Sequence, residues 1–119
     1  MAFRFRNFRV YQDAKSLHKE IVFLANQFPR SYWYLADQIK RSSLSVVLNI
    51  AEGSSKQSDK DFNRYLAISL GSVDETVASL EVAFDLNIVT KEQLQYFEKN
   101  CDVISKQLGG FSKKLKNSA

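Results

Sequence analysis

Glycine and proline are scarce in this sequence. Four Gly and one Pro occur among 119 residues, whereas the two together make up about 12% of an average soluble protein. Tight hairpins and strand–helix crossovers depend on these residues for their turns. The shortage therefore excludes a turn-rich β fold and favours a few long helices joined by short connections.

Cysteine and histidine occur once each, as Cys101 and His18. One cysteine cannot form an intramolecular disulfide, and the two residues supply too few ligands for a zinc site or a di-iron helical bundle. No nucleophile stands in a recognisable pattern near His18, and no glycine-rich phosphate loop is present. We therefore expect no metal, no cofactor and no enzymatic activity; a small hydrolase that uses His18 is the enzymatic alternative.

Long apolar runs are also missing. None approaches the roughly 20 residues that span a bilayer, and residues 1–9 alternate Phe with Arg instead of forming the apolar core of a signal peptide. Hydrophobic residues at 45% and charged residues at 25% are typical of a folded globular chain. We expect a cytoplasmic protein without membrane contact.

Four segments carry the apolar spacing of amphipathic helices. In the first, Val10, Ala14 and Leu17 begin a series that steps by four and three residues as far as Phe28. The same spacing recurs three more times, and the predicted helices span 8–28, 31–53, 58–87 and 90–117. Helices joined by short connections pack as antiparallel neighbours. We predict an all-α protein with a single domain over 1–119, an up-down-up-down antiparallel four-helix bundle.

Local signals mark the ends of these helices. Pro29 stops the first helix. Ser58 with Asp61, and Thr90 with Gln93, have the spacing of N-terminal capping boxes. The third and fourth helices are therefore expected to begin directly after Ser58 and Thr90.

The glycines suggest further positions. Gly53 is predicted to end the second helix in the left-handed conformation, and Gly71 to mark a close approach inside the third helix. The pair Gly109–Gly110 lies inside the fourth helix and is expected to kink or fray its last turns.

Polar residues interrupt the inner faces of the second and third helices. They are Ser42, Ser45, Asn49 and Glu52 on the second helix and Ser69, Ser72 and Thr76 on the third. The structural interpretation is that small hydroxyl residues let the helices approach, while Asn49 and Glu52 bond across the pair or cap the turn at Gly53. The functional interpretation is a polar groove for a ligand or a partner. A buried Glu52 would need a donor, with Arg41 or Lys56 as candidates.

Charge is unevenly distributed, although the net charge is only +4. Residues 1–19 carry five basic and one acidic side chain, residues 57–102 four basic and nine acidic, and residues 103–119 four basic and none acidic. Antiparallel packing brings the basic segments to one end of the bundle, which we call the basic pole. Its residues are Arg4, Arg6, Arg9, Lys56, Lys60, Arg64, Lys113, Lys114 and Lys116.

Such a pole suits contacts with nucleic-acid phosphates, with bases or riboses stacked on the neighbouring rings. The acidic residues Glu52, Asp59 and Asp61 dilute it. Two plainer interpretations stay open: the lysines near the end of the fourth helix complement the helix dipole, and the pole is a solvated or subunit-bridging face. The first arginines are expected in an extended arm, with rings on one side and guanidinium groups on the other.

Aromatic residues are abundant, fifteen in all. This is more than one slender bundle can bury, so part of them is expected to form a second apolar surface. Those off the helical spacing are Phe3, Phe5, Tyr11, Phe23, Tyr32, Trp33 and Tyr34. We therefore expect a homo-oligomer.

Residues 41–75, and above all the run from Asn49 to Gly53, resemble a bacterial family of four-helix-bundle proteins. The family was first noted as reading frames in intervening sequences of 23S rRNA genes, and it includes the accessory subunit of diversity-generating retroelements. Asp61–Phe62 and Gly71–Ser72 extend the resemblance, which covers nearly the whole chain.

This resemblance implies a homopentameric barrel of bundles with a basic surface that binds RNA or DNA and, in the retroelement branch, docks a reverse transcriptase. It implies no enzymatic activity, and it assigns mainly structural roles to Asn49, Glu52 and Gly53. The function we expect is nucleic-acid binding through the basic pole. The alternative is a protein-interaction scaffold without a direct nucleic-acid role.

Overall fold

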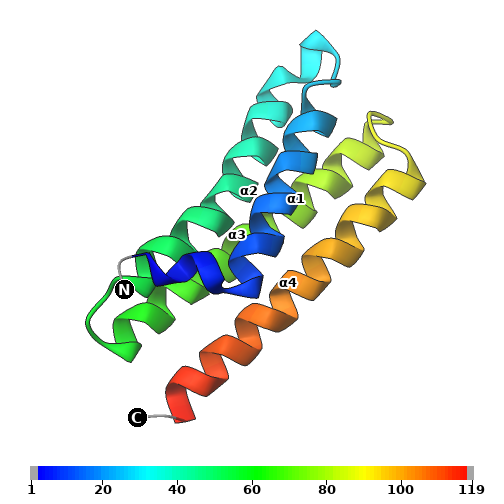
Figure 1. Ribbon diagram of the computed structural model, residues 1–119. Coiled ribbons are helices and arrows are strands. Elements are labelled where there is room, and N and C mark those ends of the chain that lie inside the picture. Colours follow the sequence, from blue (N-terminus) through cyan, green and yellow to red (C-terminus); the bar gives the residue numbers. More distant parts are fainter. Residues whose placement is uncertain (1–2, 118–119) are drawn as a thin grey trace.

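The computed structural model describes residues 3–117, and within them it contains four α-helices, two short 3-10 helices and no β-strand. Consecutive α-helices run in opposite directions along a body 47 Å long (Figure 1). The elements are η1 (Arg4–Asn7), α1 (Arg9–Ala25), η2 (Arg30–Tyr32), α2 (Trp33–Ser54), α3 (Asp59–Asp85) and α4 (Lys91–Asn117). The prediction of an all-α fold with four helices is confirmed.

The connection between α1 and α2 is longer than expected. The first helix ends at Ala25, because the amides of Gln27 and Phe28 bond carbonyls only three residues back, those of Leu24 and Ala25, at 3.0 Å each. Pro29 follows directly and disfavours a helical conformation in the residue before it. Residues 30–32 form η2, so α2 begins at Trp33 and not at residue 31.

The caps predicted from sequence are present. The Asp61 amide donates to Ser58 Oγ (3.1 Å) at the start of α3. At the start of α4 the Thr90 amide donates to Gln93 Oε1 (2.9 Å), and the Gln93 amide donates to Thr90 Oγ1 (3.1 Å). This reciprocal pair is a complete capping box.

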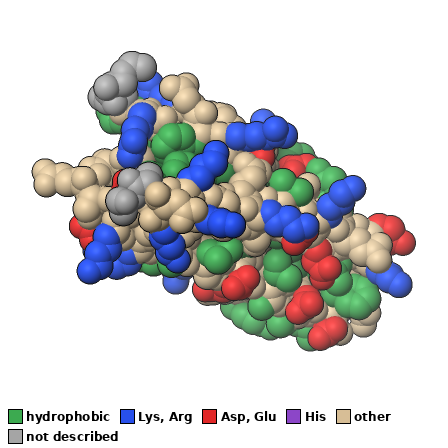
Figure 2. Space-filling model, turned by 90° about the horizontal axis from the view of Figure 1, so that it is seen from below, with side chains coloured by type: hydrophobic (Ala, Val, Ile, Leu, Met, Phe, Trp, Pro, Cys, Tyr) green, Lys and Arg blue, Asp and Glu red, His purple; other side chains and the backbone are tan. Residues whose placement is uncertain are grey.

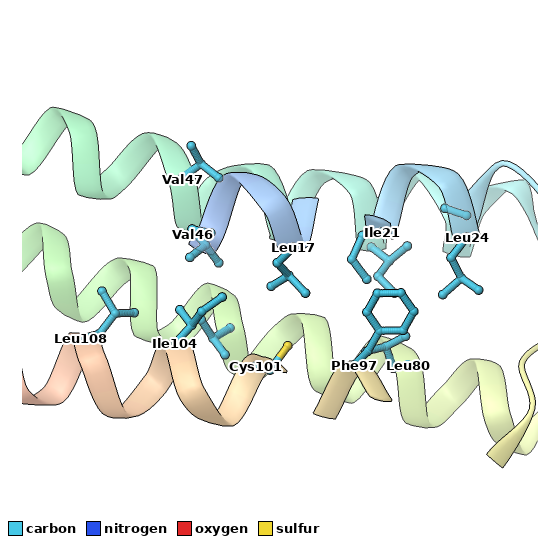
Figure 3. Packing of buried hydrophobic residues seen from close by; sticks show 14 of the residues in the cluster. Leu17, Ile21, Leu24, Val46, Val47, Leu80, Phe97, Cys101, Ile104 and Leu108 are labelled. Carbon is cyan, nitrogen blue, oxygen red and sulfur yellow. The ribbon is translucent and has the colours of Figure 1, made fainter. Parts of the chain in front are cut away.

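The core lies along the axis of the bundle and receives side chains from all four helices (Figure 3). Leu17, Ile21, Ile104 and Leu108 are at most 2% exposed, as the helical spacing predicts. Cys101 is fully buried among them.

The glycines play different roles from those predicted. Gly53 lies inside α2, and no described glycine has a positive φ. A Cβ at Gly53 would lie 2.7 Å from Tyr65 Cβ and 3.0 Å from Phe62 Cδ1, so the absent side chain is what lets α2 and α3 approach. Gly71 has no atom within 4 Å of such a Cβ, so the expected close approach there is wrong.

The four helices are not packed equally. The α2–α3 interface is the most extensive and the direct α1–α4 interface the smallest. Grooves therefore follow the α1–α4 line, including one of about 770 Å³ beside Phe23 and Tyr96. These grooves and the ends of the bundle are the parts of the surface that a ligand or partner could contact.

Candidate nucleic-acid interface

Arg4 and Arg6 lie in the 3-10 helix η1 and Arg9 begins α1, so the extended arm predicted for these arginines is wrong. Arg4 Nε donates to the Ser54 carbonyl (3.1 Å), and its guanidinium lies 5.5 Å from the Phe62 ring centroid. Gln12 Nε2 donates to the Arg6 carbonyl (2.8 Å). All three arginines are exposed, and Arg4 is the one that fastens η1 to the end of α2.

Phe3 is the exposed ring of this segment. It is 58% exposed, adopts a left-handed backbone conformation with φ 65°, and carries the Arg6 guanidinium 4.9 Å from its centroid. Phe5 packs edge-on against Tyr11 with centroids 4.8 Å apart, and both are half-buried. Phe8 and Tyr65, the other rings near the basic residues, are likewise half-buried, so Phe3 is the one of these rings that lies mostly in solvent.

The turn between α2 and α3 contributes a second group of cations. The Tyr65 ring lies between Lys56, whose Nζ is 5.0 Å from its centroid, and Arg64, whose guanidinium is 5.8 Å away. Arg64 also contacts Asp61 at 3.6 Å. Lys60 is exposed in the first turn of α3.

The end of α4 contributes the third group of cations, next to the start of α3. Ser112 Oγ donates to Asn63 Oδ1 (2.5 Å), and the Phe111 ring packs against Phe62 with centroids 5.2 Å apart. These contacts join the last turns of α4 to the first turns of α3. The lysines that follow are exposed, namely Lys113, Lys114 and Lys116.

The predicted basic pole therefore exists as a surface. Its cations come from η1 and the start of α1, from the α2–α3 turn and from the end of α4, which meet at the lower end of the bundle in Figure 1. Figure 2, seen from below, shows many Lys and Arg side chains toward the left and middle and most Asp and Glu side chains toward the right. At the opposite end of the bundle, the acidic residues Glu81, Asp85 and Glu92 are exposed at the end of α3 and the start of α4.

The motif Asn49, Glu52 and Gly53 does not form a ligand site. Glu52 is exposed, so the donor that a buried Glu52 would need, Arg41 or Lys56, is not required. Asn49 Nδ2 donates to the Ser45 carbonyl (2.9 Å) of its own helix and does not reach across to α3. Because Glu52 is exposed and Asn49 bonds only groups of its own helix, Gly53 is the member of the motif that sets how closely α2 and α3 pack.

Hydroxyl groups line the α2–α3 interface instead of opening a groove. Ser42 bonds Thr76 and Ser45 bonds Ser72, each at 2.8 Å, and Ser69 Oγ donates to the Val46 carbonyl (2.9 Å). Among the described residues, every buried side-chain polar atom has a partner. The polar stripe is thus accounted for by helix packing, in agreement with the structural interpretation.

The His18 and Cys101 side chains both contribute to the packing of the bundle. His18 Nδ1 lies 2.7 Å from Ser43 Oγ, but Ser43 is 0% exposed and its Oγ also donates to the Lys40 carbonyl (3.2 Å). A substrate cannot reach a serine in this position. Burial raises the pKa of the Cys101 thiol to about 12, so this sulfur stays protonated at neutral pH.

His18 is expected to make stability depend on pH. Burial lowers its pKa below 6.5, so between that lowered value and 6.5 the unfolded chain binds more protons and stability falls as the pH falls. The loss is complete below the folded-state pKa, with a slope of at most about 1.4 kcal/mol per pH unit for one proton. Urea unfolding from pH 7.5 to 5 should show the decline in the wild type and a weaker one in His18→Gln, and identical profiles would contradict it.

Residues 3–117 contain neither a membrane-spanning helix nor a metal-binding cluster. No helix there is long and apolar enough to cross a membrane. No cluster of three His, Cys, Asp or Glu side chains in that range is arranged to hold a metal ion.

One part of the surface was missed by the sequence analysis. A groove of about 420 Å³ lies beside the basic pole, lined by Phe8, Arg9 and Val10 from the start of α1 and by residues near the end of α4. The α4 residues are Gln107, Gly110, Phe111 and Lys114. In the sequence, Gly110 is the residue that could have indicated this groove, but the prediction for it was a kink or fraying of the helix. The helix in fact continues without interruption to Asn117.

These features define a small four-helix protein with one basic end, a polar but internally satisfied α2–α3 interface and an incompletely closed α1–α4 side. A family model described as 23S rRNA-intervening sequence protein matches residues 6–110, and the chain belongs to this family. The predicted family is thereby confirmed.

A solved structure supports the same relationship. It is the crystal structure of a protein of unknown function from the S23 ribosomal protein family of Bacteroides thetaiotaomicron, 28% identical in sequence, with a TM-score of 0.83. The match covers 87% of this chain and 98% of that one. No curated protein matches the sequence significantly.

Proposed function

We propose that this protein is a non-enzymatic binder of RNA or DNA whose basic pole neutralises phosphates. The observation that carries the proposal is the meeting of cations from three separate segments at one end of the bundle. Helix dipoles account for the lysines at the end of α4 but not for Arg9, which stands in the first turn of α1 with no acidic residue beside it in that turn. The contact of Arg9 with Asp13, one turn further on, is long at 3.8 Å, so an external anion would stabilise the Arg9 cation further.

The proposal includes self-association, as a homopentamer by the family resemblance. Large apolar side chains lie exposed on several helices, including Phe23 at 74%, Leu48 at 55% and Ile68 at 48%. Self-association would cover those of these side chains that lie together, since contiguous apolar patches are uncommon on monomers. A ring of subunits would also place several basic poles on one nucleic acid, which strengthens binding by avidity.

A protein-interaction scaffold, such as an accessory subunit of a reverse transcriptase, is the second candidate. The observation in its favour is the α1–α4 groove of about 770 Å³ beside the exposed rings of Phe23 and Tyr96. Its lining is mostly apolar and lies away from the basic pole. In the scaffold model the groove takes a partner protein and the pole has no nucleic-acid role.

The salt dependence of binding tests the first function. Replacing Arg6, Lys60 and Lys113 with Gln should weaken binding of a mixed-sequence nucleic acid at least about tenfold and reduce the slope of log K against log salt by up to about three. Arg4 is spared because it fastens η1. Fluorescence anisotropy from about 50 mM salt upward measures both quantities.

A matched triple variant controls for net charge. Replacing Arg30, Lys91 and Lys99 with Gln removes the same charge from exposed positions outside the basic pole and should leave the slope nearly unchanged. Equal effects of the two variants, or no binding by the wild type at about 50 mM salt, would overturn the proposal. Light scattering of the same samples reports the assembly, and a mass of 13.7 kDa would contradict self-association.

A further inference from the structure

The groove beside the basic pole combines an apolar floor with a charged rim. Val10 is 4% exposed, and the Phe8 and Phe111 rings meet edge to face with centroids 5.0 Å apart. Arg9 from α1 and Lys114 from α4 line the same groove. The size of about 420 Å³ lies within the usual range of small-ligand sites, about 300–1,000 Å³.

The two cations on the rim, Arg9 and Lys114, have few acidic partners within the part of the chain that the structure describes. The Arg9 side chain is 88% exposed and meets Asp13 only at 3.8 Å, while Asp13 accepts a shorter bond from Gln107 Nε2 (2.7 Å). Lys114 takes part in none of the ion pairs formed within residues 3–117. Both charges therefore remain available to a ligand.

The start of α1 adds donors at the same place. The first amides of an α-helix have no carbonyl partner within the helix. The N-cap residue, Phe8, has no side chain that could accept from them. An anion near Arg9 would meet these amides and the positive end of the helix dipole as well.

Gly110 forms part of the wall of the groove. A Cβ at Gly110 would meet no atom within 4 Å, so packing within the chain does not require glycine there. Glycine is nevertheless unfavourable in a helix interior. Because the space around such a Cβ is open, a larger side chain at this position can extend into the groove without displacing other parts of the protein.

We infer that this groove binds one unpaired nucleotide of a single-stranded nucleic acid, with a phosphate between Arg9, Lys114 and the first amides of α1. Because the Phe8 and Phe111 rings stand at 73° to each other, the base stacks on one of them and meets the other edge-on. The inference rests on the proposed function and deepens it, because it requires unpaired nucleotides where the pole alone would accept a duplex. Stacking on rings beside a cationic rim is how single strands are held without sequence preference.

A neighbouring groove provides the comparison. It lies between α3 and α4, is of similar size at about 440 Å³, and has two lysines, Lys113 and Lys116, in its lining. Its apolar residues are aliphatic, among them Leu66, Leu70 and Leu108, and no ring lines it. Gly109 occupies the place there that Gly110 has in the first groove. Charge and size are thus matched, and only one of the two grooves offers aromatic faces.

The test compares Gly110→Leu with Gly109→Leu, using fluorescein-labelled 12-nucleotide single strands and blunt 12-base-pair duplexes of the same sequence at 150 mM salt. Gly110→Leu fills the proposed site and should weaken single-strand binding about 5- to 100-fold, the range for losing one stacked base. Its duplex affinity should stay unchanged. Gly109→Leu should change neither affinity, and both variants should melt at or above the wild-type temperature because Leu favours helix.

Each other outcome overturns the inference. Unchanged single-strand binding by Gly110→Leu, an equal loss on the duplex, or an effect of Gly109→Leu alone would show that the groove does not hold an unpaired nucleotide, although the basic pole could still bind nucleic acid. A change in oligomeric mass on light scattering would assign the groove to a contact between copies of the chain. Absence of binding by the wild type to either probe would refute the proposed function itself.

Discussion

Replacing Phe62 with alanine is expected to lower the free energy of unfolding by about 3–5 kcal/mol, the usual cost of removing a buried aromatic ring. Phe62 is 1% exposed and lies where the segments of the basic pole meet. Its ring packs against Phe8 and Phe111 at centroid distances of 6.3 and 5.2 Å, and Arg4 lies over it. The variant therefore leaves a cavity and loosens η1 and the end of α4 together. Urea unfolding followed by circular dichroism at 222 nm measures the loss.

Phe62→Leu is the matched control for this variant. It keeps most of the apolar volume and removes the ring contacts, so its loss should be less than half that of Phe62→Ala. If Phe62→Ala costs under about 1 kcal/mol, the ring does not hold the three segments together, and the basic pole would have to be regarded as loosely attached.

Gly53→Ala is expected to destabilise the protein by about 1–2 kcal/mol although alanine is the better helix former. A gain of up to about 1 kcal/mol in helix propensity is opposed by overpacking that typically costs 1–3 kcal/mol. The new Cβ would lie 2.7 Å from Tyr65 Cβ, an atom next to the backbone that cannot swing away, so the helices themselves must separate. A fall of several degrees in melting temperature checks the result.

Gly71→Ala tests the same argument with the opposite sign. Gly71 also lies inside a helix, is exposed, and has nothing within 4 Å of a Cβ. The substitution should stabilise the protein by up to about 1 kcal/mol. If both variants shift stability in the same direction, close approach of α2 and α3 is not what requires glycine at position 53.

Much of the fold follows from local chemistry. The capping residues Ser58 and Thr90 mark the starts of α3 and α4 because a side-chain acceptor beside an unpaired amide acts within four residues. Pro29 likewise acts on its immediate neighbours. The apolar spacing identifies buried residues such as Ile21 and Ile104 because a helix repeats every 3.6 residues.

The errors concern residues whose roles depend on another helix. Gly53 and Gly71 are both glycines inside helices, but only the first lies against side chains of a neighbouring helix. Glu52 shares a helix face with Ser45 by spacing, yet α3 covers the serine and leaves the carboxylate in solvent. Spacing along one helix does not report how far a neighbour extends.

The features of the candidate site also divide into those that the sequence could predict and those that depend on contacts between helices. The cations of the basic pole could be assigned from the sequence, because chain order and antiparallel packing bring the segments together. The engagement of Arg4 with Ser54 and Phe62, and the groove between Arg9 and Lys114, could not be assigned, because each depends on distances between separate helices.

The sequence by itself determined the four helices, their main core residues and the family, since periodicity, caps and motifs are properties of short stretches of chain. Tertiary structure alone decided which glycine packs against a neighbour, which arginine is committed to the fold and where the surface is hollowed. These depend on contacts between residues as far apart as Arg4 and Phe62, or Arg9 and Lys114, and such contacts exist only after the helices have packed.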